Sequence, residues 1–192
     1  KCRKAGLKPD CVVLVATIRA LKMHGGVAKD ALKAENLEAL EKGFANLKKH
    51  VENLQRYGVP VIVSINRFST DTDAEVALLN KLCAGVGVKC VLADHWAAGS
   101  EGATDLARTV VETIEKTPSK FKPLYPDEMK LWDKVKTIAQ EIYGAADITA
   151  DKSVKDRLAE LEKEGFGNFP ICVAKTQYSF TTNVDTKGAP TG

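Results

Sequence analysis

Short apolar runs alternate along the chain with longer stretches in which apolar residues recur at helical spacing. The short runs are residues 11–17, Val61–Ile65, Lys89–Ala93 and Pro170–Ala174. Runs that are continuously apolar, rather than alternating, are typical of strands buried on both faces of a parallel sheet. The pattern therefore predicts a strand at each of these places.

Helical spacing separates the predicted strands. From Glu35 to Tyr57 the apolar residues lie alternately three and four positions apart, which predicts an amphipathic helix. Thr72 and Glu75 have the spacing of a capping box and predict the start of the next helix. Further helices are predicted over residues 106–114, 130–143 and 151–164, with a loop over 94–102 and a connector over 117–126.

This order of elements predicts an α/β fold with a mainly parallel sheet, helices on both faces and right-handed crossovers. Residues 1–116 are expected to form the α/β portion that carries the ligand site. Residues 117–192 are expected to add a connector, two helices and a further strand packed on the same sheet.

Composition narrows the class of protein. The chain is 44% hydrophobic and 28% charged with a formal net charge of +3, which excludes a disordered chain and gives no reason to expect nucleic-acid or membrane binding. No apolar run is long enough to span a bilayer. The five cysteines form no CxxC pair, so we expect reduced, buried thiols in a cytoplasmic protein.

Polar, basic and aromatic residues follow each predicted strand directly. Because parallel sheets bind ligands at the carboxyl ends of their strands, these residues predict a site for an anionic ligand with a flat ring. They are Thr17, Arg19, Lys22 and His24; Asn66, Arg67 and Phe68; His95 and Trp96; and Lys175, Thr176 and Gln177.

Each of these residues also has a simpler interpretation. Arg19, Lys22 and Lys175 are equally compatible with solvated loop charges, and Phe68 and Trp96 with packing at the rim of the core. His24 and His95 have no partner histidine at ligand spacing, so no metal site is expected. Neither GxxxxGK[ST] nor GxGxxG occurs, so a nucleotide would not be held by a loop of those kinds in this chain.

Several longer motifs together resemble the formate–tetrahydrofolate ligase family across essentially the whole chain. They are Val15-Ala-Thr-Ile-Arg-Ala-Leu-Lys-Met-His-Gly-Gly26, Gly58-Val-Pro-Val-Ile-Val-Ser-Ile-Asn-Arg-Phe68, Thr70-Asp-Thr72, His95-Trp96, Ile142-Tyr-Gly-Ala145 and Pro170-Ile-Cys-Val-Ala-Lys-Thr-Gln-Tyr-Ser179.

The resemblance implies a ligase of one-carbon metabolism. Such an enzyme uses ATP with Mg²⁺ to convert formate to formyl phosphate, which tetrahydrofolate attacks to give 10-formyltetrahydrofolate. The substrates are thus formate, ATP and tetrahydrofolate, and the full-length enzyme is expected to be a cytoplasmic homo-oligomer. Residues 1–116 would carry the folate and nucleotide site.

The resemblance also implies roles for residues at the strand ends. Phe68 and Trp96 would sandwich the pterin. From their places after the predicted strands, Arg19, Lys22 and Lys175 are the candidate catalytic residues. If they face the ligand crevice they would meet anionic groups, and neutralising one in the full-length enzyme should slow turnover about tenfold or more. Further candidates are Thr17, His24, Asn66 and Gln177.

The family's glycine-rich phosphate loop lies upstream of this region. We therefore expect the chain to be an internal portion of such a ligase, inactive by itself. The alternative is a non-catalytic folate-binding or scaffolding remnant of the same fold.

Overall fold

The computed structural model describes residues 2–174, 180, 181, 183 and 185–190. The chain divides into two compact units, Lys1–Phe121 with Asn183–Ala189 and Lys122–Thr182 with Pro190–Gly192. The start of the predicted connector packs on the first unit. The Lys120 N–H donates to the Gly58 carbonyl at 2.8 Å, and the Phe121 ring stacks on Tyr57 at 6.4 Å between centroids.

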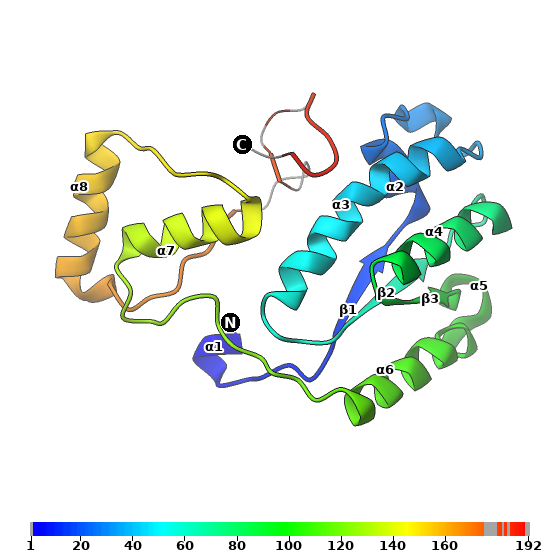
Figure 1. Ribbon diagram of the computed structural model, residues 1–192, viewed down its shortest axis with the longest axis horizontal. Helices are drawn as coiled ribbons and strands as arrows, with labels where there is room; N and C mark the ends of the chain where they lie inside the picture. The colour runs from blue at the N-terminus through cyan, green and yellow to red at the C-terminus, as the bar shows by residue number, and fades with distance from the viewer. Residues whose placement is uncertain (1, 175–179, 182, 184, 191–192) are drawn as a thin grey trace. The chain divides into compact units, whose positions relative to one another are not determined.

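A three-stranded parallel sheet organises the first unit (Figure 1). Its strands are β1 (Val12–Ala16), β2 (Val61–Asn66) and β3 (Lys89–Ala93), in the order β1-β2-β3. The predicted α/β class is therefore confirmed, and the first three predicted strands are present.

Central strand β2 is buried on both faces, as its continuous apolar pattern predicts. Val61, Val63 and Ile65 pack into the core with apolar residues of α3 (Leu37–Gln55) and α4 (Asp73–Gly85). The prediction is wrong for β1, because Val13 is 38% and Val15 is 60% exposed. In the described sheet β1 is an edge strand, and only the face bearing Leu14 and Ala16 packs on the core.

Helix α2 (Ile18–His24) follows β1 and packs closely on α3. A Cβ atom added at Gly43 of α3 would overlap the backbone carbonyl of Leu21 in α2, and one added at Gly25 would overlap that of Ala39. Glycine at these two positions therefore allows the helix backbones to touch. A 3-10 turn (Lys29–Ala31) lies between the two helices along the chain.

Short helical turns replace the loop predicted over residues 94–102. After β3 come α5 (His95–Ala98) and a 3-10 turn (Gly99–Ala103), before α6 (Thr104–Lys116). Helix α6 contacts β3, and in Figure 1 the strands run between α3 and α6. The first described element is a short helix, α1 (Cys2–Ala5).

The second unit is helical in its described part. Helix α7 (Leu131–Ile138) continues into a π turn (Ala139–Tyr143), and α8 (Lys152–Leu161) continues into another (Glu162–Phe166). Both helices were predicted. The Nζ of Lys134, which is fully buried, donates to the carbonyls of Asp127, Gly167 and Phe169 at 2.7, 2.6 and 3.1 Å.

The strand predicted over Pro170–Ala174 is wrong, because residues 170–174 have no regular secondary structure. The preceding carbonyls are bonded to Lys134, and the Ile171 N–H donates to the Tyr125 hydroxyl at 2.9 Å instead of to a neighbouring strand. The expectation of buried thiols is also wrong for Cys172, which is exposed; Cys83 is buried.

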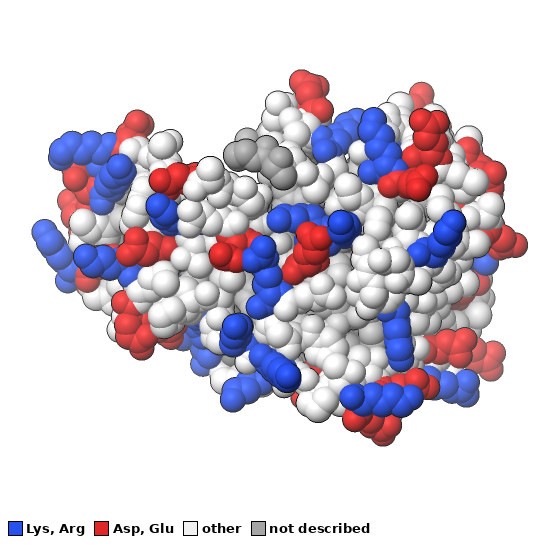
Figure 2. Space-filling view, viewed as in Figure 1, with Lys and Arg blue, Asp and Glu red and all other residues white. Residues whose placement is uncertain are grey.

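Charged side chains of both signs lie on the drawn face of the molecule (Figure 2). On the face drawn in Figure 2, lysine and arginine side chains are interspersed with aspartate and glutamate. Within the part of the chain that the structure describes, no helix combines the length and apolar character needed to cross a membrane.

Candidate functional site

The carboxyl ends of the three strands lie along one edge of the sheet. Ala16 is in register with Ile65, and Asn66 with Ala93, so the segments that follow the strands start side by side. The first candidate residue there, Thr17, caps α2: its hydroxyl oxygen accepts from the Ala20 N–H at 3.2 Å. Its side chain therefore positions the helix that carries Arg19.

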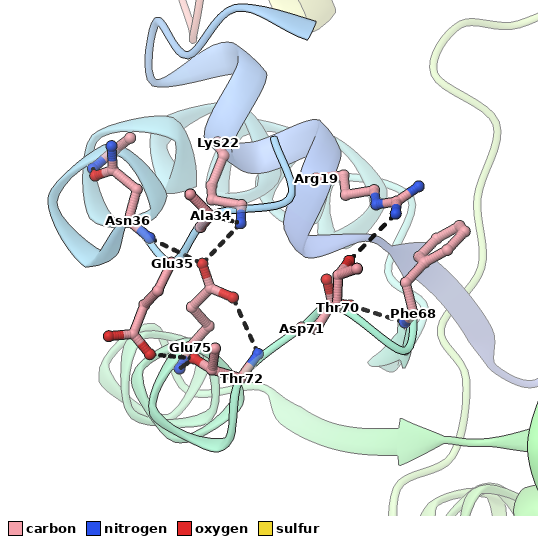
Figure 3. Close-up of polar contacts among 11 residues, drawn as sticks. Arg19, Lys22, Ala34, Glu35, Asn36, Phe68, Thr70, Asp71, Thr72 and Glu75 are labelled. Carbon is pink, nitrogen blue, oxygen red and sulfur yellow. Dashed lines mark hydrogen bonds and ion pairs between the residues drawn. The ribbon is translucent and has the colours of Figure 1, made fainter. Parts of the chain in front are cut away.

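Arg19 connects the segment after β1 with the segment after β2 (Figure 3). Its Nη2 donates to the Thr70 hydroxyl at 3.2 Å, and its Cζ lies 4.4 Å from the centroid of the Phe68 ring. This cation–π contact covers one face of the ring. The buried Nε of Arg19 has no hydrogen-bond partner among the described residues.

The segment after β2 is held by a buried carboxylate. Asp71, which is 4% exposed, accepts from the Phe68 N–H at 2.8 Å, and its own N–H donates to the Phe68 carbonyl at 3.0 Å. The turn is thereby fixed, and with it the position of the Phe68 ring.

Phe68 and Trp96 line one cavity of about 520 Å³, together with Arg67, Ser69, Asp94 and Ala97. Trp96 is 81% exposed, so its interpretation as a core residue is wrong. Phe68 is half-buried beneath Arg19. The aromatic residues predicted to act together are therefore brought to the same cavity, one from each of two neighbouring strand ends.

The structure supports neither sequence-based interpretation of Lys22. It is neither a solvated charge nor open to a ligand: it is fully buried, and its Nζ donates to Glu75 Oε1 and to the Ala34 carbonyl, both at 2.8 Å (Figure 3). Glu75 also accepts from the Asn36 and Thr72 N–H groups, the latter completing the predicted capping box. Burial raises the pKa of Glu75, but these hydrogen bonds outweigh it and the net pKa is lowered.

The sequence model of the family called formate–tetrahydrofolate ligase matches residues 1–192. The chain belongs to this family. Curated formate–tetrahydrofolate ligases from Granulibacter bethesdensis, Pelagibacter ubique and Ruegeria pomeroyi are 64%, 56% and 55% identical to it over 192 residues. The chain covers 34% of the length of each of these relatives.

Other predicted residues of this ligase-family chain lie outside the cavity lining. Asn66 ends β2 and is half-buried. His24 ends α2, about 9 Å along the helix from its start. Lys175 and Gln177 lie outside the described residues.

Two residues of this region were not predicted from the sequence as functional. Asp94 lines the cavity, and its place between β3 and His95-Trp96 was the available signal. Glu75 was recognised only as part of a capping box. Its pairing with Lys22, 53 positions away, has no local signal in the sequence.

The environment of His24 predicts that the stability of the full-length protein depends on pH. Burial lowers the pKa of His24, with a smaller contribution from nearby Lys187, and burial also lowers the pKa of His50. The neutral forms are therefore preferred in the folded state. Their contribution to stability is fully present above about pH 6.5 and is lost as the pH falls through the lowered folded-state pKa.

Denaturant unfolding at pH 7.5 and 5.5 checks this expectation. We expect wild type to lose stability between the two values and His24→Gln to lose less. Exposed His95 supplies the control substitution, which should leave the difference in place. An unchanged difference in His24→Gln would contradict the prediction.

Proposed function

We propose that this chain forms the pterin-binding portion of an ATP-dependent ligase that makes 10-formyltetrahydrofolate from formate and tetrahydrofolate through formyl phosphate. One observation carries the proposal: in a chain of the formate–tetrahydrofolate ligase family, two aromatic side chains line a single cavity at the carboxyl ends of neighbouring parallel strands. Such strand ends are where open parallel sheets bind ligands.

Phe68 and Trp96 suit a flat heterocycle. One face of Phe68 is covered by Arg19, and the cavity provides the space in which a ligand would stack against the aromatic residues. Stacking a base-like ring on an aromatic side chain contributes about 1–3 kcal/mol per ring. A pterin offers a comparable polarisable surface.

Arg19 stays the candidate for the anionic step: it contacts Phe68, although it is not itself among the residues that line the cavity. Its guanidinium is fixed by Thr70 and Phe68, and its Nε–H donor has no partner in the described residues. A fixed guanidinium suits the oxyanions of formyl phosphate or of a carboxylate. Lys22 we assign a positioning role, because its ammonium is enclosed by Glu75 and Ala34. Lys175 and Gln177 stay predictions.

The Mg²⁺ that accompanies ATP requires few protein ligands. The described residues contain no cluster of three or more His, Cys, Asp or Glu side chains suited to a metal. Mg²⁺ that accompanies ATP is held largely by phosphate oxygens and water.

Replacing Trp96 tests the proposal. In the full-length protein, Trp96→Ala should raise the apparent constant for tetrahydrofolate by about five- to a hundred-fold, because one stacking partner is lost. The formate and ATP constants should change far less. Steady-state kinetics with formate-dependent ADP release measure all three, and Trp96→Phe, which keeps a ring, should be milder.

Half-buried Trp132 lies in the second unit, so Trp132→Ala supplies a control that should leave the tetrahydrofolate constant unchanged. Equal shifts in the constants for all three substrates would argue against a pterin site at Trp96. Tetrahydrofolate binding without formate-dependent ADP release by wild type would instead favour the non-catalytic alternative.

A further inference from the structure

Asp94 shares the aromatic cavity. It follows Ala93, the last residue of β3, and the register of Asn66 with Ala93 brings the start of this segment beside that of the segment bearing Phe68. Asp94 lines the same cavity as Phe68 and Trp96. An acidic residue is thus present at the cavity that the two aromatic residues line.

The backbone of Asp94 is fixed on both sides of the residue. Its N–H donates to the Gly102 carbonyl at 3.0 Å, and its carbonyl accepts from the Ala98 N–H at 3.0 Å. A Cβ atom added at Gly102 would overlap the Asp94 carbonyl, so glycine there permits the close approach. The side chain therefore projects from a defined position.

The oxygens of the Asp94 carboxylate are available to accept hydrogen bonds from a ligand. Among the described residues its oxygens have no hydrogen bond or ion pair, and its side chain does not cap α5. The neighbouring cation, Arg67, is bonded to Asp73 at 2.7 Å. A half-buried carboxylate normally finds donors, and here the free volume on its open side is the cavity.

The edge of a pterin supplies matching donors. Its ring N3–H and its 2-amino group point the same way, and a carboxylate can accept both in parallel charge-assisted hydrogen bonds. Stacking tolerates any flat ring, because every such ring has a π face. Discrimination between heterocycles must therefore come from groups that meet the ring edge.

We propose that Asp94 accepts hydrogen bonds from the N3–H and 2-amino group of the pterin and so determines which heterocycle the cavity binds. This inference rests on the proposed function, since it adds recognition of the ring edge to stacking by Phe68 and Trp96.

Equilibrium binding to the full-length protein tests the assignment with two probes, tetrahydrofolate and its 2-desamino-2-methyl analogue, which lacks the amino donor. Wild type should prefer tetrahydrofolate by about tenfold or more. Asp94→Asn should weaken tetrahydrofolate binding about 10- to 100-fold, because the amide NH₂ opposes one of the two donors. The analogue should lose about threefold or less.

Two controls separate the possible failures. Asp105→Asn, at an exposed carboxylate paired with Arg108, should change neither constant. Trp96→Ala should weaken both probes alike, because both rings stack. If wild type binds neither probe, the proposed function itself fails. If wild type and Trp96→Ala behave as expected but wild type does not distinguish the probes, or Asp94→Asn weakens both equally, only the assignment of Asp94 is overturned.

Discussion

Full-length protein carrying Lys22→Met is expected to lose about 3–5 kcal/mol of its free energy of unfolding. Lys22 and Glu75 are both fully buried and 2.8 Å apart. Methionine matches the length of the lysine stem but leaves the Glu75 charge without its cation. The penalty for an unpaired buried charge is much larger than the net contribution of an intact pair.

Urea unfolding measures the loss, and two further variants test whether the unpaired Glu75 charge causes it. Lys48→Met removes an exposed lysine that is ion-paired with Glu52, and should change stability by less than about 0.5 kcal/mol. Adding Glu75→Gln to Lys22→Met should recover part of the loss, since the unpaired charge is removed. A loss below about 1 kcal/mol in Lys22→Met would show that the pair is not a significant source of stability.

Acid titration provides a second readout of the same pair. The folded-state pKa of Glu75 is lowered relative to the ordinary 4.5. Its contribution to wild-type stability is therefore fully present above about pH 4.5 and is lost as the pH falls through the lower, folded-state value. In Lys22→Met the main group that lowers this pKa is removed, so the loss of stability on acidification should shrink or reverse.

Gly43→Ala is expected to destabilise the protein by about 2–3 kcal/mol, although alanine is the better helix former. The new methyl group would overlap the Leu21 carbonyl and the Gly25 nitrogen. These are backbone atoms, so relief requires α2 and α3 to separate. Because α2 also carries Arg19, which contacts Phe68, the constant for tetrahydrofolate should rise as well.

Gly85→Ala is the matched control for Gly43→Ala. Gly85 ends α4, and a Cβ atom added there would meet no atom within 4 Å. That substitution should be neutral or slightly stabilising. Denaturant midpoints of the two variants give the comparison. Equal midpoints would mean that α2 and α3 can separate at little cost in stability.

Local patterns predicted most of the first unit. The spacing of Leu40, Phe44, Leu47 and Val51 predicted α3, and all four residues are buried. Thr72 and Glu75 predicted the start of α4. The strand over Pro170–Ala174 was wrong, because a short apolar run says nothing about whether a neighbouring strand is available.

Residues of the site could be predicted from the sequence only where they directly follow a strand. Phe68 and Trp96 follow β2 and β3 directly, and the sheet brings them to the same cavity. Lys22 also follows a strand, but it lies on a helix that turns its side chain toward Glu75. That pairing depends on the packing of α2 against the segment that starts α4, which spacing alone does not reveal.

The exposed valines of β1 affect how these 192 residues would behave when prepared alone. Val13 and Val15 face water on an edge strand of the described sheet. An apolar edge strand is a template for strand addition by another molecule. Self-association through this strand would then limit the concentration and storage life of such a preparation.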